Sequence, residues 1–315
     1  MSPPPDTTSV DQPIRDAAGN WVDRIAPPPW RPYLRLARAD RPIGTWLLLW
    51  PCWWSIALAA PSVGAQWPNP ILLILFSLGA FIMRGAGCAF NDIVDRDMDA
   101  KVARTAERPI ASGRVSVKRA WVFIAALCCM GLLILIFLNT DTIILGVASL
   151  GLIAIYPFMK RLTYWPQIFL GLAFNWGALM GWTAVTGRLS LPPLLLYGAG
   201  IAWTLGYDTI YAHQDKEDDA LVGIKSTALK FGSNTRSWLW GFYSIAFFLL
   251  ALAGGATGLA WPFYIALGFA GAHLVWQIKI LDIDSPARCL ALFRSNRDFG
   301  ALVFLAILLG SVFLR

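Results

Sequence analysis

The chain carries a dense group of polar residues whose types and spacing are suited to binding a divalent cation. Its members are Asn91, Asp92, Asp95 and Asp99. Residues three, four or seven positions apart share one face of a helix, so Asn91, Asp95 and Asp99 are predicted to form one stripe of oxygen atoms. Carboxylates crowded on one face repel each other unless a cation lies between them. Such a stripe favours Mg²⁺, which prefers octahedral oxygen coordination and is commonly held by a few carboxylates together with substrate phosphates.

A second acidic group follows further along the chain. It consists of Asp208, Asp215, Asp218 and Asp219, with Tyr211 among them. The interval of seven residues between Asp208 and Asp215 equals that between the second and fourth members of the first group, and Asp215 and Asp219 are predicted to share a helix face. The match predicts a weak internal duplication in which two helix pairs face one another. For either group alone, a solvated, salt-bridged loop is the alternative to a metal site.

Basic residues accompany both acidic groups, as the binding of a diphosphate requires. The metal would bridge some phosphate oxygens while lysine and arginine side chains hold others. The residues assigned to this role are Lys101, Arg104, Arg108, Lys160, Arg161 and Lys216. Part of this charge also sets the orientation of the chain in the membrane. Neither GxxxxGK[ST] nor GxGxxG occurs, so the sequence does not predict ordinary nucleotide binding.

The elements that must position these residues are membrane helices. Hydrophobic residues make up 57% of the 315 positions and charged residues only 14%, against about 25% charged residues in soluble domains. Nine segments are apolar and long enough to cross a bilayer: about 43–60, 71–90, 120–138, 142–158, 166–185, 191–211, 238–256, 261–279 and 299–314. The prediction is an all-α polytopic membrane protein, with a flexible Pro-rich cytoplasmic tail over 1–40 and a nine-helix domain over 41–315.

The distribution of charge predicts how the chain is oriented. Of the 26 lysines and arginines, all but Arg84, Arg188 and Arg315 lie in the N-terminal tail or in loops after even-numbered spans. The positive-inside rule therefore places the N-terminus and both acidic groups on the cytoplasmic side, and the C-terminus outside. Arg84 lies within the second predicted span, and an intramembrane arginine is a candidate functional residue by default. A cation-coupled transporter is a rival class, but it would place its acids near the middle of the membrane.

Several segments resemble the UbiA superfamily of membrane aromatic prenyltransferases, in particular the branch that acts on 4-hydroxybenzoate in ubiquinone biosynthesis. These segments are NDIVDRDMD, KVARTAERPIASG, YPFMKR, DTIYAHQDKEDD and GIKSTALKFG, and the similarity extends from about Arg41 to the last span. The resemblance implies nine helices around a central cavity, closed on the cytoplasmic side by caps that carry the two acidic motifs. It also implies a polyprenyl diphosphate and 4-hydroxybenzoate as substrates and Mg²⁺ as cofactor.

By the same resemblance, Asn91, Asp95, Asp99, Asp215 and Asp219 engage Mg²⁺ and through it the diphosphate, with Asp92 and Asp218 in support. Asp208 is assigned to the hydroxyl group of the acceptor, with Tyr156 or Tyr211 as helpers. Arg84 or Arg41 is assigned to the benzoate carboxylate.

Other aromatic acceptors, such as homogentisate, a naphthoate or a chlorophyllide, are alternatives to 4-hydroxybenzoate. The expected location is the bacterial inner membrane, or the mitochondrial inner membrane in a eukaryote, with the active site facing the cytoplasm in the bacterial case. Beyond the lipid bilayer, the sequence indicates neither a nucleic acid nor an obligate protein partner.

Overall fold

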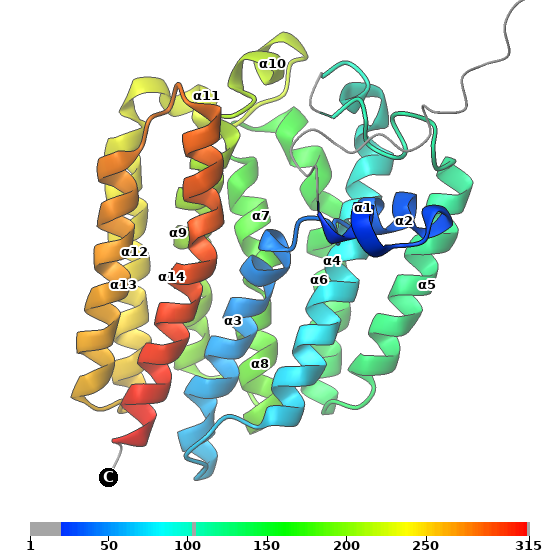
Figure 1. Cartoon of the computed structure of the whole chain (residues 1–315). Helices are drawn as coiled ribbons and strands as arrows, with labels where there is room; N and C mark the ends of the chain where they lie inside the picture. The colour runs from blue at the N-terminus through cyan, green and yellow to red at the C-terminus, as the bar shows by residue number, and fades with distance from the viewer. Residues whose placement is uncertain (1–19, 103–104, 314–315) are drawn as a thin grey trace, which may run out of the picture. The chain divides into compact units, whose positions relative to one another are not determined.

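The computed structural model describes residues 20–102 and 105–313 and contains no β-strand within them. Figure 1 shows the helices in chain order. The α-helices are α1 (Trp21–Ile25), α2 (Arg31–Leu36), α3 (Ile43–Ala59), α4 (Pro70–Asp99), α5 (Val117–Leu135), α6 (Thr140–Leu162), α7 (Pro166–Phe174), α8 (Gly177–Thr186), α9 (Leu191–Ala212), α10 (Lys216–Leu221), α11 (Thr227–Phe231), α12 (Thr235–Ala256), α13 (Trp261–Ile280) and α14 (Pro286–Val312). Short 3₁₀ helices are η3 (Pro28–Trp30), η4 (Ala60–Val63) and η5 (Gly232–Asn234).

In their described parts the predicted apolar segments are mostly helical. Eight helical stretches of the described chain are long and apolar enough to span a membrane. The protein is therefore an all-helical, multi-pass membrane protein. The sixth predicted span corresponds to α9, which has 22 residues but is not one of the eight. Its prolines, glycines and Asp208 lower its hydropathy. The count of nine spans and the orientation remain predictions.

The N-terminal tail is predicted to be flexible up to residue 40, and its described part contains helices. Residues from Trp21 onward form α1, η3 and α2. Asn20 caps α1 by accepting a hydrogen bond from the backbone N–H of Val22 at 2.8 Å, and the indole of Trp21 donates to the carbonyl of Ala39 at 2.9 Å. The prolines of this segment begin helical turns, where a missing N–H costs nothing, instead of keeping the chain extended.

The chain divides into two compact units, and α4 and α5 each contribute to both. The first unit comprises 1–42 and 81–131, and the second comprises 43–80 and 132–315. In the first unit, Leu36 of α2 is buried against Ala86 and Ala89 of α4 and against Ala120 of α5. Gly85 permits this approach, because an added Cβ would lie 3.1 Å from the Cβ of Ala37.

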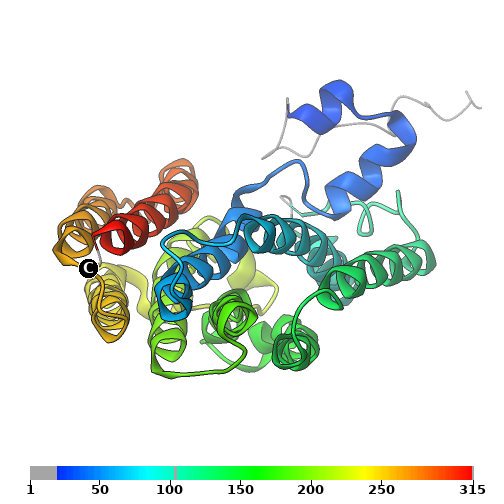
Figure 2. The same ribbon diagram turned by 90° about the horizontal axis from the view of Figure 1, so that it is seen from below.

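The second unit is a bundle in which α9 packs against α7, α12 and α14, while α3 packs against α8 and α14. Figure 2 shows its long helices end-on. Trp203 is at the centre, with its ring 5.2 Å from those of Trp54 and Phe299. Both indoles have polar partners: Trp54 donates to the carbonyl of Gly300 at 2.8 Å and Trp203 to Asn296 Oδ1 at 2.8 Å. Such packing and hydrogen bonds hold membrane helices together, because lipid removes most of the hydrophobic driving force.

The fifth predicted span is divided into α7 and α8 at Asn175. The buried side chain of this residue donates to the carbonyl of Gly171 at 2.9 Å and to the hydroxyl of Thr204 at 2.8 Å. Gly200 makes room for it, since a Cβ there would lie 2.1 Å from Asn175 Oδ1. Side-chain hydrogen bonding thus compensates part of the backbone bonding lost at the break, as hydrocarbon surroundings demand.

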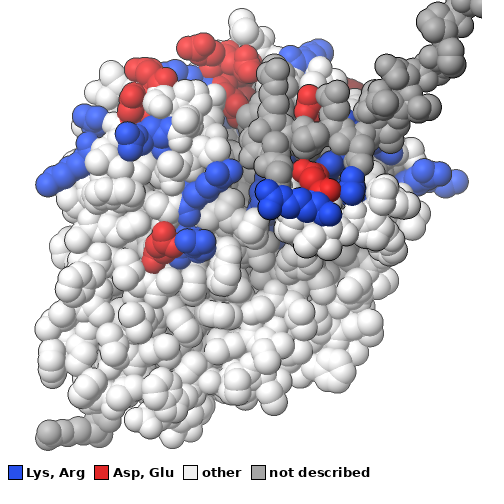
Figure 3. Space-filling model, in the orientation of Figure 1, with Lys and Arg blue, Asp and Glu red and all other residues white. Residues whose placement is uncertain are grey.

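In the second unit, the ends of α6, α9 and α13 and the starts of α7, α12 and α14 lie at the end that carries α10 and α11 (Figure 1). In the space-filling view most of the visible charged side chains lie toward the upper end, with one acid–base group lower down and a largely uncharged surface below (Figure 3). The arrangement matches the sequence prediction that charge is concentrated on one side of the spans.

Candidate active site

The first acidic group lies on the last three turns of α4, which continues to Asp99. The segment is helical as predicted, and a loop is excluded for Asn91 to Asp99. Asp92, Asp95 and Asp99 are the buried members, with exposed fractions of 1%, 0% and 6%. Asn91 is half-buried. The buried stripe is therefore made of three aspartates at offsets of three and four, and Asp92 belongs to it more fully than the predicted member Asn91.

Two arginines neutralise this buried stripe. Arg38 donates to Asp92 Oδ1 at 2.6 Å, and Arg108 donates to the same oxygen at 3.3 Å and to Asp99 Oδ2 at 2.7 Å. Arg108 was predicted as a diphosphate ligand, and in the structure its guanidinium bridges two of the acids. Asp92 Oδ2 is buried and has no hydrogen-bond partner among the described residues.

Arg38 is held in an unusual backbone conformation, with φ at 57°. This left-handed backbone conformation is unfavourable for residues other than glycine. The contacts of the Arg38 side chain must therefore offset the free-energy cost of the backbone strain. Burial disfavours the charged guanidinium, but Asp92, Cys88 and Asp40 together outweigh it and raise the pKa of Arg38. Burial also raises the pKa of nearby Asp40, and the positive charges of Arg41 and Arg38 offset part of this rise.

The two arginines predicted to bind the benzoate carboxylate have different surroundings. Arg84 lies on α4 two turns before the acids, and its Nε and Nη1 atoms are buried without a hydrogen-bond partner among the described residues. Arg41 donates to Asp40 Oδ2 at 3.3 Å. Buried guanidinium hydrogens without acceptors are costly, and a carboxylate is the acceptor that suits them best. Arg84 is thus the stronger candidate.

The remaining predicted bases of the first group contribute little to the described geometry. Lys101 is exposed and lies just beyond the end of α4. Arg104 lies outside the residues that the structure describes.

The second acidic group has a different local structure from the first. α9 ends at Ala212, and Asp215 immediately precedes the six-residue helix α10, which carries Asp218 and Asp219. All three acids are half-buried, and the N–H of Asp219 donates to the carbonyl of Asp215 at 2.8 Å. The equal spacing of seven residues thus runs along one helix in the first group and across a turn in the second. The spacing does not reflect equal structure.

Asp208 lies on α9, one turn before that helix ends, and is half-buried. The side chain of Gln167 of α7 lies beside its carboxyl group and accepts the backbone N–H of Thr227 at 3.2 Å. Gln167 thereby connects Asp208 to the start of α11. Of the predicted helpers, Tyr211 is half-buried with its ring 4.4 Å from that of Phe293, and Tyr156 is half-buried on α6.

The lysine predicted to bind diphosphate from this group has another partner in the structure. Lys216 Nζ lies 2.5 Å from Asp284 Oδ1 and donates to the carbonyl of Ile283 at 3.3 Å. It therefore ties α10 to the turn between α13 and α14 and lowers the pKa of Asp284. Burial, with a contribution from Lys216, lowers the pKa of His213 to about 4. The imidazole is thus neutral near pH 7.

Lys160 and Arg161 lie in the last turn of α6, as predicted. The carbonyl of Lys160 accepts the backbone N–H of Lys225 at 2.8 Å, and Lys225 Nζ donates to the carbonyl of Leu162 at 3.3 Å. The chain after α10 is therefore fixed to the end of α6. The end of α6, whose last turn carries Lys160 and Arg161, lies at the end of the bundle that carries α10 (Figure 1).

Two site residues were missed by sequence reasoning, Arg38 and Gln167. Arg38 counted only as one of several N-terminal positive charges, and it is separated from Asp92 by 54 positions. Gln167 is an uncharged residue in an apolar segment. The one feature of the sequence that could have indicated Gln167 is its position at the start of a predicted span.

The α4 acids offer the type of ligand that a hard cation takes. They supply three buried carboxylates on one helix face, including one oxygen without a hydrogen-bond partner. Within 20–102 and 105–313, however, no three His, Cys, Asp or Glu side chains converge closely enough to hold a metal ion by themselves. Arg108 lies between two of the acids. A metal cation and this guanidinium would therefore compete for the same two carboxylates.

The chain as a whole is similar to several known proteins. Curated relatives include the mitochondrial 4-hydroxybenzoate polyprenyltransferases of Aedes aegypti, 51% identical over 95% of this chain and 70% of the relative, and of Homo sapiens, 53% identical over 91% and 77%. Among solved structures, a UbiA homolog from Archaeoglobus fulgidus bound to DMAPP and Mg²⁺ has the same fold. The TM-score is 0.67, with 20% identity over 87% of this chain and 98% of that one.

A sequence profile of the UbiA prenyltransferase family matches residues 48–310 of the chain. This range covers the spans, both acidic groups and the turns that carry them. This match and the relatives that are more than half identical show that the chain belongs to the UbiA prenyltransferase family.

Proposed function

We propose that this protein transfers a polyprenyl group from a polyprenyl diphosphate to 4-hydroxybenzoate, at the ring carbon ortho to the hydroxyl, in a reaction that depends on Mg²⁺. The observation that carries the proposal is the buried stripe of Asp92, Asp95 and Asp99, in a chain more than half identical to enzymes named for this reaction. In the reaction the allylic C–O bond breaks, diphosphate leaves, a C–C bond forms and the ring carbon loses its proton.

The acids of both groups are proposed to hold Mg²⁺, with Asn91, Asp95, Asp99, Asp215 and Asp219 as ligands and Asp92 and Asp218 in support. Bound Mg²⁺ supplies positive charge that stabilises the leaving diphosphate. Asp92 is given the supporting role because its Oδ1 already accepts from two guanidinium groups. Lys160 and Arg161 are proposed to hold diphosphate oxygens. Since Arg108 pairs with acids and Lys216 with Asp284, each would need to exchange partners to do the same.

Arg84 is proposed to bind the carboxylate of the aromatic acid. Its buried Nε and Nη1 atoms have no acceptor among the described residues, and a carboxylate is the strongest acceptor for guanidinium N–H groups. Arg41 is a weaker alternative, because Asp40 already accepts from its Nε. A benzoate at Arg84 would remove an unsatisfied polar group at the same time as it gains an ion pair.

Asp208 is proposed to accept a hydrogen bond from the phenol hydroxyl and so make the ring carbon beside it more nucleophilic. The side chain of Gln167 lies beside this carboxyl group and is proposed to orient it, as a positioned general base requires. Tyr211 or Tyr156 would assist from the same unit. The allylic cation that forms on ionisation needs surroundings that exclude water.

The test is a prenyl-transfer assay in membranes with 4-hydroxybenzoate, a polyprenyl diphosphate and Mg²⁺, with and without a chelator. Product should require the metal, and Asp95→Ala or Asp215→Ala should abolish nearly all of it. Matched controls are Asp97→Ala, on the same helix but 84% exposed in its side chain, and Glu217→Ala, an exposed acid on α10. Full activity of the Asp95 or Asp215 variant would contradict the assignment of that residue.

The same assay separates the rival functions. Homogentisate, a naphthoate or a chlorophyllide in place of 4-hydroxybenzoate tests the alternative acceptors. A cation-coupled transporter would show no prenylated product with any of them, and uptake would follow the cation gradient. The second acidic group lies at the end of α9 and on α10, whereas a transport site is expected near the middle of the bilayer.

We further propose that the acidic groups face the cytoplasm in a bacterial inner membrane, or the corresponding side of the mitochondrial inner membrane in a eukaryote. The positive charge of the loops supports this orientation. Labelling of single cysteines at exposed Glu217 and Arg188, from either side of sealed vesicles, tests it. The two positions should be labelled from opposite sides.

A further inference from the structure

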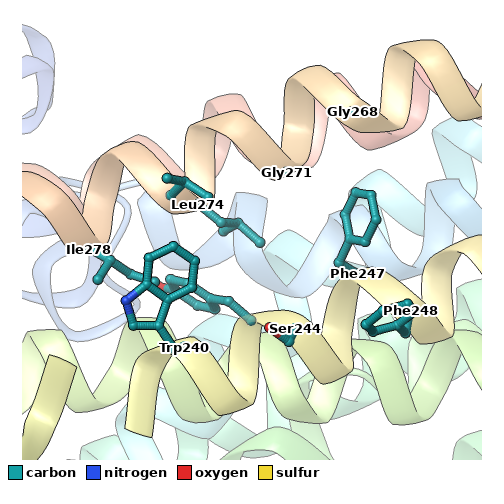
Figure 4. A pocket seen from close by; sticks show the side chains of 10 residues that line it. Trp240, Ser244, Phe247, Phe248, Gly268, Gly271, Leu274 and Ile278 are labelled. Atoms are coloured by element: carbon teal, nitrogen blue, oxygen red, sulfur yellow. The ribbon is translucent and has the colours of Figure 1, made fainter. Parts of the chain in front are cut away.

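A groove runs between α12 and α13 of the second unit, away from the residues assigned to catalysis. Its volume is about 280 Å³. Figure 4 shows Trp240 and Ile278 at one end of the groove and Phe247, Phe248 and Gly268 toward the other. Both helices belong to stretches long and apolar enough to span a membrane. The groove therefore lies along membrane-spanning helices.

Two glycines of α13 shape the groove. A Cβ at Gly271 would lie 2.8 Å from the ring of Phe247, so this glycine allows α12 and α13 to approach closely. A Cβ at Gly268 would meet no atom within 4 Å. The first glycine brings the helices together and the second leaves open space beside them.

The chemistry of the lining fits an alkyl chain. Apart from the hydroxyl of Ser244 the labelled side chains are apolar or aromatic (Figure 4), and the hydroxyl of Tyr243 is bonded to Gln277 Oε1 at 2.8 Å. The volume equals roughly nine times the 30 Å³ share of a water molecule, which corresponds to a similar number of chain carbons. A polar ligand would leave its hydrogen-bonding groups unsatisfied here.

Positive charge lies at the end of the groove marked by Trp240 and Ile278. Arg236 precedes Trp240 by one helical turn, is exposed, and donates to the carbonyl of Leu281 at 2.5 Å. Lys279 follows Ile278 and is also exposed. The adjoining turn carries Asp282, whose carboxylate accepts the N–H of Asp284 at 3.1 Å, and Asp284, which is paired with Lys216. With that pair neutral, Arg236 and Lys279 against Asp282 give this end a net positive charge. Tryptophan beside it is typical of the membrane interface.

From the apolar groove and its basic end, we propose that α12 and α13 form a binding site for one anionic phospholipid. One acyl chain occupies the groove, and the phosphate group lies at Arg236 and Lys279. An arginine and a lysine at the head-group level attract anionic lipids electrostatically, and burial of several chain carbons adds affinity. The site is separate from the proposed substrate chemistry and does not depend on it.

The experiment is native mass spectrometry of the full chain in detergent, titrated with phosphatidylglycerol or phosphatidylcholine. The wild type should retain one phosphatidylglycerol with at least tenfold preference over phosphatidylcholine. Gly268→Leu fills the groove and should weaken binding of both lipids by about tenfold or more. Gly241→Leu is the matched control, because Gly241 lies exposed on α12 outside the lining and its Cβ would also meet no atom within 4 Å. It should bind as the wild type does.

The head-group half has its own variants. Arg236→Gln combined with Lys279→Gln should remove the preference for phosphatidylglycerol while leaving the affinity for phosphatidylcholine. Ser244→Leu fills the groove from α12 and replaces Gly268→Leu if that variant does not fold.

Undiminished lipid binding after the groove is filled overturns the proposal, and so does an unchanged preference after both charges are removed. A polyprenyl diphosphate should not displace the bound phospholipid. If it displaces the phospholipid from both the wild type and Gly241→Leu, the groove holds the isoprenoid tail and the proposal is wrong.

Discussion

Replacing Asp92 by asparagine should destabilise the first unit far more than replacing its main partner. Asp92→Asn keeps the shape of the side chain and removes its charge. Arg38, which is only 7% exposed, would then face a neutral amide and keep only the weaker attraction of Asp40. Its other hydrogen bond among the described residues goes to the carbonyl of Arg35 at 3.1 Å. In the opposite variant, Arg38→Met, Asp92 still accepts from Arg108 at 3.3 Å.

The magnitude follows from the distance. At 2.6 Å and an effective dielectric constant of about 20, the gross attraction between the two charges is about 6 kcal/mol. Desolvation of both groups offsets part of it, and the loss of one partner from a buried pair typically costs 3–5 kcal/mol. We expect a cost of about 4 kcal/mol in the free energy of unfolding for Asp92→Asn. For Arg38→Met, with one guanidinium still present, we expect about 2 kcal/mol.

The assay is reversible unfolding in mixed micelles, followed by ellipticity, for the wild type, both single variants and the double variant. The double variant removes both charges, so its cost should be well below the sum of the two single costs, with a coupling energy of about 2 kcal/mol. Asp97→Asn is the control, because its exposed pair with Arg96 at 3.2 Å should contribute little.

Two results would refute this reasoning. A cost below about 1 kcal/mol for Asp92→Asn would mean that the pair is solvated and the burial is not as described. A larger cost for Arg38→Met than for Asp92→Asn would mean that Arg108 does not compensate Asp92.

Three further changes have directions set by the described contacts. Arg84→Gln should raise KM for 4-hydroxybenzoate about tenfold to a hundredfold, as expected for a lost charged hydrogen bond; a rise in KM for the diphosphate instead would move Arg84 to that subsite. Asp284→Asn should release Lys216 and speed amide hydrogen exchange in α10, while Asp298→Asn, which breaks an exposed pair on α14, should not. Asp40→Asn should gain stability relative to the wild type as pH rises from about 4. Burial raises the pKa of Asp40, so ionisation of that carboxyl group destabilises the folded wild type and cannot occur in the variant. A difference in the free energy of unfolding that stays constant between pH 4 and 7 would contradict this.

Hydropathy located the helices of the chain but not all of their ends. α4 continues nine residues beyond the predicted end at residue 90, and α14 begins at Pro286 rather than near 299. In both places the added turns carry charge, which a search for apolar segments passes over. Local signals support α14, since Pro286 begins the helix and Ser285 caps it by accepting the N–H of Arg288 at 3.4 Å.

The acids of the site could be read from the sequence, but their partners could not. Carboxylates beside membrane segments are conspicuous because isolated charge there is costly. Which cation compensates each one depends on contacts between distant positions, as for Asp92 with Arg38. A sequence with several arginines offers several pairings of equal plausibility. Side-chain burial, which separates Asp95 from neighbouring Asp97, likewise follows from packing and leaves no mark on local composition.

The two acidic groups compensate their charge in different ways, and this difference has a consequence for cation binding. On α4, Arg38 and Arg108 already neutralise Asp92 and Asp99, so a cation gains little unless it brings further ligands or displaces Arg108. A diphosphate does both, because it supplies oxygens to Mg²⁺ and an acceptor for the released guanidinium. We therefore expect Mg²⁺ to bind the free protein weakly and to bind together with the diphosphate. Arg108→Gln, which removes the competing charge from Asp99, should strengthen Mg²⁺ binding in the absence of diphosphate, as isothermal titration would show, and should weaken the binding of diphosphate. If free Mg²⁺ binds no better to that variant than to the wild type, the guanidinium and the metal do not compete for the same carboxylates.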